Sequence, residues 1–181
     1  MNTQSKLSHH VDGEWQRHSF LPTYYIQSDQ LIAGLPANSL EVFETLSKQL
    51  TAPLYLLYVL HTPRGEGAPG RYQSPEMDTT TVATLLRKYQ ALLTGDARCD
   101  LWVHSPEDNA TLVLDRHNLL FAYGPLQGFA ATLNQLGFLE GEPVIPLPHQ
   151  HHYRETLDFA ARELLAELPW RYTPLRPEDE Q

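Results

Sequence analysis

Apolar residues repeat with a helical period in four stretches of the chain. Between residues 78 and 95 they recur at i, i+3, i+4 and i+7, the spacing that places them on one face of a helix. The same period follows a capping box at Asn38 and continues to about residue 50. It returns at 125–136 and at 157–168. The pattern therefore predicts four helices.

Other stretches have the patterns of strands. From 98 to 124 apolar and polar residues alternate, and turn residues at 106–109 and 116–118 divide the stretch into three strands of an antiparallel meander. Residues 24–27 favour a further short strand. Residues 54–60 are apolar on both alternating sets, which is typical of a strand covered on two faces, and we expect this strand at the centre of the sheet.

The order of these elements is β-α-β-α-β-β-β-α-α, which predicts an α+β fold with helices packed on a mixed sheet of four to five strands. One connection is expected to be a parallel crossover. We interpret 1–23 as an irregular N-terminal arm, 24–175 as a single α+β domain and 176–181 as an acidic C-terminal tail.

Composition narrows the class of protein. The 181 residues carry a net charge of -9, which argues against binding to a nucleic-acid backbone. The longest apolar run, at 54–60, is far shorter than the roughly 20 residues of a membrane span, and the polar N-terminus has no signal-peptide core, so we expect a cytoplasmic protein. The single cysteine, Cys99, cannot form an internal disulfide, and its position predicts a buried thiol with a raised pKa.

The segment 62–75 is expected to be a long loop, and it contains a literal G-x-G-x-x-G. It differs from a dinucleotide fingerprint because Pro69 removes a backbone donor and Pro75 delays the helix start. What remains are two guanidinium groups, Arg64 and Arg71, which are candidate ligand-binding residues for a carboxylate or phosphate.

Nine histidines are the other unusual feature of the composition. His149 and His151 are separated by one residue in an extended segment, so both rings can face one metal ion, and His152 follows them directly. These three are the candidate ligands of Zn²⁺ or another divalent transition metal, and no other cofactor is predicted. Groups at strand ends and turns are the candidate catalytic residues: His61, His104, Asp115 and His117.

Two classes of function fit these features. The first is a non-catalytic binding or interaction protein, for example one that resembles an inhibitor or immunity protein in its charge. Its acidic surface, formed by Glu107, Asp108 and Glu178–Glu180, would attract a basic protein partner. The alternative is a small hydrolase or transferase that uses the strand-end histidines, with or without a metal, and the arginine-bearing loop for an anionic substrate. Of the two, we expect the binding protein, and the sequence leaves the oligomeric state open.

Overall fold

The computed structural model describes residues 4–37 and 39–179, and its main element is a sheet of nine strands. These are β3 (Thr23–Gln27), β4 (Gln30–Gly34), β5 (Tyr55–Leu60), β6 (Gly70–Gln73), β7 (Cys99–Ser105), β8 (Ala110–Leu114), β9 (Leu119–Tyr123), β10 (Leu139–Glu140) and β12 (Arg171–Thr173). Their order across the sheet is β10-β3-β4-β9-β8-β7-β5-β6-β12. Only the β10–β3 pair of this described sheet is parallel.

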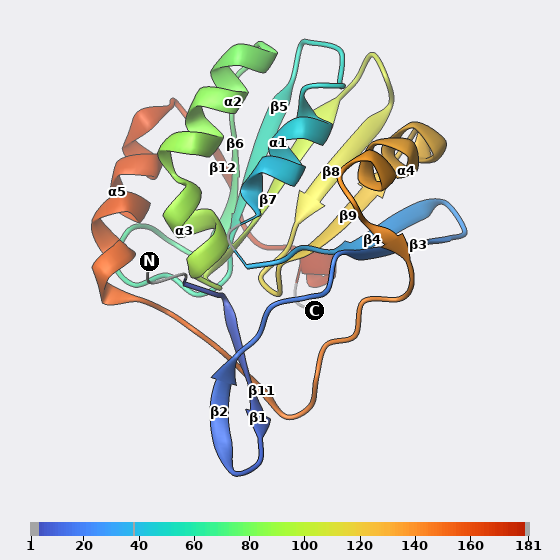
Figure 1. The fold of residues 1–181 in the computed structure, drawn as a ribbon. Helices are drawn as coiled ribbons and strands as arrows, with labels where there is room; N and C mark the ends of the chain where they lie inside the picture. The colour runs from blue at the N-terminus through green and yellow to red at the C-terminus, as the bar shows by residue number, and fades with distance from the viewer. Residues whose placement is uncertain (1–3, 38, 180–181) are drawn as a thin grey trace.

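Five α-helices of the described chain cover one face of this sheet (Figure 1). They are α1 (Leu40–Ser47), α2 (Thr79–Lys88), α3 (Gln90–Gly95), α4 (Leu126–Gln135) and α5 (Asp158–Glu167). The core lies between the helices and the sheet, where alternate side chains such as Leu56, Tyr58 and Leu101 are buried. None of the helices in the described ranges has the length and apolar character needed to cross a membrane.

A second sheet of three strands projects beyond the end of the main one (Figure 1). It consists of β11 (His149–His151), β1 (Leu7–Val11) and β2 (Glu14–Arg17), in the order β11-β1-β2. The prediction of an irregular arm is therefore wrong for residues 7–17. The hairpin was not predicted because β2 is exposed at every position and so has no apolar alternation.

The α+β class and the three-stranded meander β7-β8-β9 are confirmed. The predicted helix over 78–95 is divided at Tyr89 into α2 and α3, and the Asp78 carboxylate caps its start by accepting from the Thr81 N–H. Gly137, with φ of +86°, ends α4 in the left-handed conformation that glycine adopts without strain. The predicted cap at Asn38 lies outside the described residues.

The sheet is larger than the four to five strands predicted. One missed strand, β6, lies inside the segment 62–75 that was expected to be a loop, and it pairs with β5 in an antiparallel hairpin. The remainder of that segment is held in place, because the Tyr72 hydroxyl donates to the Ala68 carbonyl and the Glu66 carboxylate accepts from Arg98. The glycine-rich sequence therefore forms an ordered hairpin connection.

The expectation that residues 54–60 form a central strand covered on both faces is also wrong. The strand β5 is third from one edge, is antiparallel to both neighbours and has helices on one side only. Leu56 faces the helices and is fully buried, whereas Leu57 is partly exposed on the opposite face. The strand is apolar at alternate positions on both faces. On the face without helices, Leu57 lies in register with Gln73 and Trp102.

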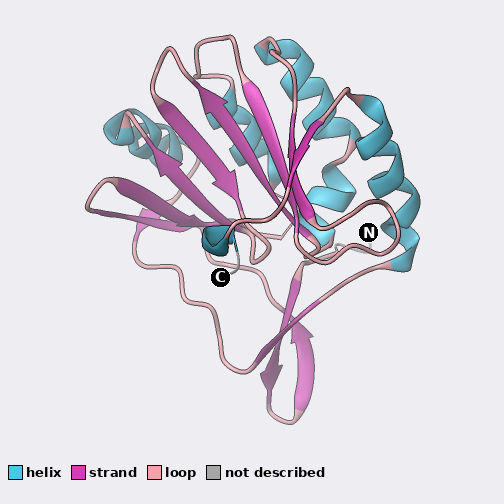
Figure 2. Ribbon diagram, turned by 180° about the vertical axis from the view of Figure 1, so that it is seen from behind, coloured by secondary structure: helices cyan, strands magenta, loops and turns pink. Residues whose placement is uncertain are grey.

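The face without helices is covered only in part (Figure 2). At the β4 and β9 end, Phe20 and Ile145 from two irregular segments pack with Ile32 and Leu119 in a small second core. The C-terminal segment also lies against this face, and its 3-10 turn, η2 (Pro177–Asp179), contributes the buried residue Asp179. In the described part of the chain, the surface over β5, β6 and β7 remains open and forms a cavity.

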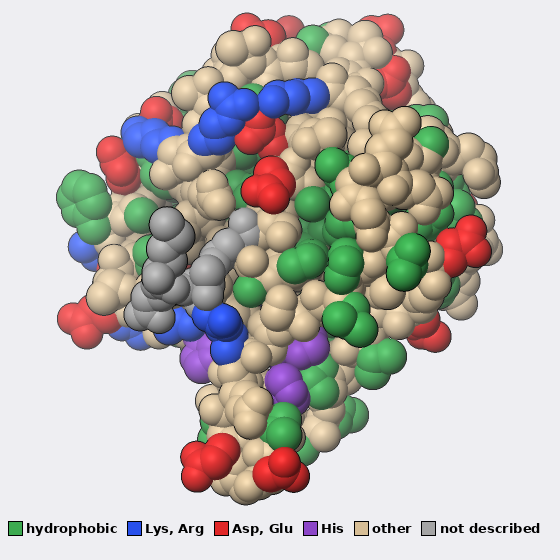
Figure 3. All heavy atoms as spheres, in the orientation of Figure 1, with side chains coloured by type: hydrophobic (Ala, Val, Ile, Leu, Met, Phe, Trp, Pro, Cys, Tyr) green, Lys and Arg blue, Asp and Glu red, His purple; other side chains and the backbone are tan. Residues whose placement is uncertain are grey.

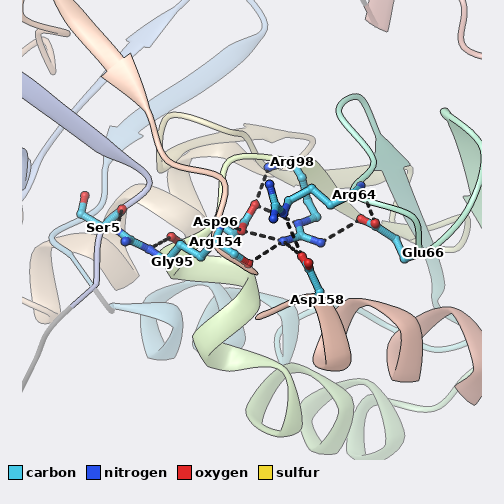
Figure 4. Close-up of polar contacts among 8 residues, drawn as sticks. All are labelled: Ser5, Arg64, Glu66, Gly95, Asp96, Arg98, Arg154 and Asp158. Carbon is cyan, nitrogen blue, oxygen red and sulfur yellow. Dashed lines mark hydrogen bonds and ion pairs between the residues drawn. The ribbon is translucent and has the colours of Figure 1, made fainter. Parts of the chain in front are cut away.

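A buried guanidinium joins the loops at one end of the main sheet (Figure 4). The side chain of Arg98 has no exposed surface, and it forms ion pairs with Asp96, Glu66 and Asp158 at 2.9 to 3.0 Å. Its Nη2 also donates to the Arg154 carbonyl at 3.0 Å. Asp96 accepts from both Nε and Nη2 of Arg98, the two-point geometry that favours arginine over lysine.

This Arg98 cluster connects distant parts of the chain. Asp96 Oδ2 accepts from the Arg154 backbone N–H at 2.7 Å, and the Arg154 side chain donates to the carbonyls of Gly95 and Ser5 (Figure 4). The connection before α5, the turn after α3 and the N-terminal segment are thereby held together. Since β11 ends at residue 151, the cluster also fixes the chain beside that strand.

Replacement of Leu56 by Asp is expected to reduce the free energy of unfolding by several kcal/mol, on the order of a domain's whole stability, because it buries an unpaired charge. Leu57→Asp should cost much less, since Leu57 lies on the open face. Urea unfolding of both variants measures the difference. Equal losses would contradict the assignment of the two faces.

Replacement of Arg98 by Met should cost about 3–5 kcal/mol, because the carboxylates of Asp96 and Glu66 would stay buried without the positive charge that pairs with them. The matched control is Arg64→Met. Arg64 contacts Asp158 from a position with 34% of its side chain exposed, so its loss should cost at most about 1 kcal/mol. Chemical unfolding of the two variants tests the prediction, and a loss in Arg98→Met no larger than the control's would refute it.

Candidate metal centre

Three histidines from the two sheets meet where the sheets adjoin. His117 lies in the turn between β8 and β9, and His149 and His151 lie on β11. One ring nitrogen from each can be chosen so that all lie within 4.8 Å of one another. Figure 3 shows histidine side chains gathered between the body of the protein and the projecting hairpin. Among the residues that the structure describes, this is the single group with metal-ligand spacing.

The strand β11 supplies two of the three rings because of its alternation. Successive side chains of a strand point to opposite faces, so His149 and His151 share one face and Gln150 lies on the other. Pairing with β1 fixes the register, with His149 opposite His9 and His151 opposite Leu7. The two rings are therefore placed by backbone hydrogen bonds.

A tight turn holds the third ring. Asp115 Oδ1 accepts from the backbone N–H groups of His117 at 2.8 Å and Leu119 at 2.7 Å. Asn118 completes the turn with φ of +65°, a conformation that asparagine tolerates better than most residues. The buried ammonium of Lys6 donates to the Asp115 carbonyl at 2.7 Å and ties the turn to the start of β1. The position of His117 is thus set by several contacts.

The hydrogen bonds of His117 and His149 use their Nδ1 atoms and leave their Nε2 atoms free to bind a metal. His117 Nδ1 is 2.7 Å from Asp115 Oδ2, and His149 Nδ1 is 3.2 Å from the Pro146 carbonyl. Such contacts orient a ligating imidazole and leave Nε2 to bind the ion. His151 Nε2 is buried, and no atom in the described part of the chain is hydrogen bonded to it. A bound metal would give this nitrogen a partner.

The environment of His151 keeps its ring in the form that binds metals. Burial lowers the pKa of His151 to about 4, and the nearby rings of His117 and His149 act in the same direction. Its imidazole is therefore neutral at pH 7, as metal coordination requires. Zn–N bonds of about 2.0–2.1 Å in a tetrahedron separate the ligand nitrogens by roughly 3.4 Å. Because the ring nitrogens lie within 4.8 Å of one another, they would need to approach by at most about 1.4 Å.

The other histidines singled out in the sequence lie elsewhere. His152 follows His151 and so faces the other way, with Nε2 at 2.7 Å from Ser8 Oγ. His61 Nε2 is 2.9 Å from Asp100, and His104 Nδ1 is 2.9 Å from Thr111 Oγ1. Of the candidate catalytic residues, the structure brings His117 to the cluster as a possible ligand and Asp115 as its orienting partner.

The two candidate anion-binding arginines are not brought together. Arg64 Nε donates to Asp158 at 3.0 Å in the Arg98 cluster (Figure 4). Arg71, on β6, donates to Asp179 at 2.6 Å on the open face of the sheet. Because the segment between them forms a hairpin with β5, they do not act as one loop. Each is used in an ion pair within the molecule.

Sequence reasoning overlooked two histidines that lie beside the cluster. The rings of His9 and His18 are 5.1 Å apart, and His9 is opposite His149 in the small sheet. Within the described ranges, His9 Nδ1 and His18 Nε2 are buried with no hydrogen-bond partner. Burial lowers the pKa of His18, with further contributions from His9 and His149. Only a prediction of the β1–β2 hairpin could have placed them here.

Comparisons with known proteins give no relationship for this chain: no protein-family model, no curated protein and no solved structure matches it. The interpretation of the histidine cluster accordingly depends on its geometry and chemistry. Cys99 is buried, and this burial raises the pKa of its thiol to about 12. Such a thiol stays protonated and packs in the core.

Proposed function

We propose that this protein binds a divalent transition metal ion, most simply Zn²⁺, through His117, His149 and His151. The observation that carries the proposal is the convergence of three ring nitrogens within 4.8 Å. Neutral imidazoles suit zinc, copper, nickel and iron, and three of them match the ligand number of open zinc sites. The bonds from His117 to Asp115 and from His149 to the Pro146 carbonyl support it further.

One consequence of binding would be a connection between the two sheets. His117 belongs to a turn of the main sheet, and His149 and His151 belong to the small sheet. An ion that binds the folded chain alone stabilises it by roughly 2.7 kcal/mol when its concentration is 100 times its dissociation constant. The metal would therefore hold the projecting sheet against the body.

A second candidate function is metal-dependent hydrolysis. In the described part of the chain three side chains form the group, which leaves a fourth tetrahedral position for water. A zinc ion held by His117, His149 and His151 would activate water for hydrolysis by lowering its pKa. His117 and Asp115 also border a cavity of about 410 Å³ that is lined by Arg116 and Tyr123. A substrate in that cavity would lie next to a metal ligand.

Binding of a basic protein through an acidic surface has weaker support. The Asp108 carboxylate accepts from the backbone and the hydroxyl of Thr51. Asp179 is buried and paired with Arg71, and Glu180 lies outside the described residues. Two of the five expected acidic groups are therefore used inside the molecule. Metal binding is the proposal with the more specific geometry.

The metal proposal predicts about one equivalent of Zn²⁺ in untagged protein that has been stripped with a chelator, reloaded and desalted. His151→Ala should lose most of this metal, because it removes one of three ligands. Elemental analysis gives the stoichiometry, and thermal unfolding with and without Zn²⁺ measures the stabilisation. A nitrophenyl ester assay of the loaded protein tests the second candidate, which requires turnover that His151→Ala abolishes.

The matched control is His152→Ala, which changes the neighbouring histidine on the other face of the segment. It should retain the wild-type metal content. Less than about a tenth of an equivalent in the reloaded wild-type protein would refute the proposed site. Equal metal content in His151→Ala and His152→Ala would refute the assignment of the ligands.

Asp115→Asn is expected to weaken zinc affinity by about 10- to 100-fold without unfolding the turn. Asparagine keeps an oxygen that can accept from the His117 and Leu119 N–H groups, but it removes the charge beside His117 Nδ1. Asp108→Asn is the control, since Asp108 accepts from Thr51 in the turn between β7 and β8, outside the cluster. Competition with a zinc-sensitive dye measures both affinities, and equal effects would contradict the orienting role of Asp115.

A further inference from the structure

The open face of the main sheet contains a cavity of about 520 Å³, a volume in the range of small-molecule sites. Its floor is built by strand register. Arg171, Gln73, Leu57 and Trp102 lie opposite one another across β12, β6, β5 and β7. This floor lies on the side of the sheet seen in Figure 2, away from the five helices. None of the three proposed metal ligands lines the cavity.

The charge of the cavity is opposite to that of the protein. Among the described residues, Arg71, Arg171 and Arg176 line it and no carboxylate does, although the chain as a whole has a net charge of -9. Arg71 is paired with Asp179. Within the described ranges, the guanidinium groups of Arg171 and Arg176 have no ion-pair partner. Two cationic groups therefore remain available to an anion.

The protein places one of its own carboxylates, that of Asp179, beside an arginine that lines this cavity. Asp179 Oδ1 accepts from Arg71 Nη1 at 2.6 Å, and its Oδ2 accepts from the Arg176 backbone N–H at 2.8 Å. The Arg71 guanidinium also lies 5.4 Å from the centre of the Trp102 ring. This internal contact shows that a carboxylate, a guanidinium and an aromatic ring fit together at the cavity edge.

The floor offers an apolar surface and one unused donor. Leu57 and the rings of Tyr55 and Trp102 line the cavity. Trp102 Nε1 is buried, and no acceptor in the described part of the chain bonds to it. Buried polar groups normally have a partner, so an orphaned donor on a residue that lines a cavity is consistent with a ligand that accepts from it. A flat apolar body with a polar edge has the matching chemistry.

We infer that this cavity binds a small organic carboxylate with an aromatic or flat apolar body. The carboxylate binds Arg171 and Arg176, the apolar body covers Leu57 and the Trp102 ring, and a polar atom of the ligand accepts from Trp102 Nε1. Binding here does not require the metal centre, because none of the proposed metal ligands lines this cavity, although Trp102 also lines the cavity beside His117. Its specificity for carboxylates follows from paired guanidinium donors, and its preference for flat ligands follows from the sheet floor.

The test is a calorimetric titration of the full chain with benzoate, with benzyl alcohol and inorganic phosphate as comparison probes. Benzoate should bind, benzyl alcohol should bind at least about tenfold more weakly because it lacks the charge, and phosphate should also be weaker because it lacks the ring. No heat from benzoate at millimolar concentration, or equal affinity for all three probes, would overturn the proposal.

Substitutions in the cavity test whether benzoate binds there. The double variant Arg171→Gln/Arg176→Gln should weaken benzoate binding by about tenfold or more, and Arg162→Gln, an exposed arginine on α5, should leave it unchanged. Trp102→Phe retains a ring and loses the donor, so it should weaken 2-hydroxybenzoate more than benzoate. Thermal unfolding verifies that each variant is folded. Wild-type benzoate affinity in the double variant, or the same loss in Arg162→Gln, would refute the site.

Discussion

The buried guanidinium of Arg98 determines where the histidine strand lies. Its Nη2 binds the Arg154 carbonyl, and its partner Asp96 binds the Arg154 N–H, so both backbone groups of Arg154 are held at the end of α3. The Ala97 N–H also donates to the His152 carbonyl. A buried ion pair is a poor source of net stability, because the desolvation of the charges offsets much of their attraction. What Arg98 supplies is a fixed position for the segment that follows His151.

The opposite side of the candidate metal centre is fixed by a different buried cation. Lys6 Nζ donates to the Asp115 carbonyl, and the Lys6 carbonyl accepts from the His152 N–H. One residue thus links the turn that carries His117 to the strand that carries His151. The three imidazoles are held in place by contacts within the protein, which would reduce the ordering that a bound metal ion has to supply. Separate sheets can therefore present a single set of ligands.

The sequence predicted those features that depend on long, regular patterns. The helices and the meander β7-β8-β9 have strong periodicity, and the buried thiol of Cys99 follows from its place in that alternation. Short strands were missed, because β6 and β12 have only four and three residues and are specified by pairing with each other. Only two of the three proposed metal ligands could be grouped from the sequence. The spacing of His149 and His151 indicated a shared face, but the approach of His117 depends on tertiary contacts such as the one from Lys6.

Net charge affects the two proposed sites in opposite ways. A protein with a charge of -9 attracts divalent cations, which favours the histidine cluster, and repels organic anions at long range. Screening limits this repulsion to about 8 Å at physiological ionic strength. Recognition of a carboxylate in the open-face cavity must therefore come from short-range contacts with Arg171 and Arg176. The ion pair between Arg71 and Asp179 fits this view, because there a carboxylate is bound at hydrogen-bond distance and partly out of water.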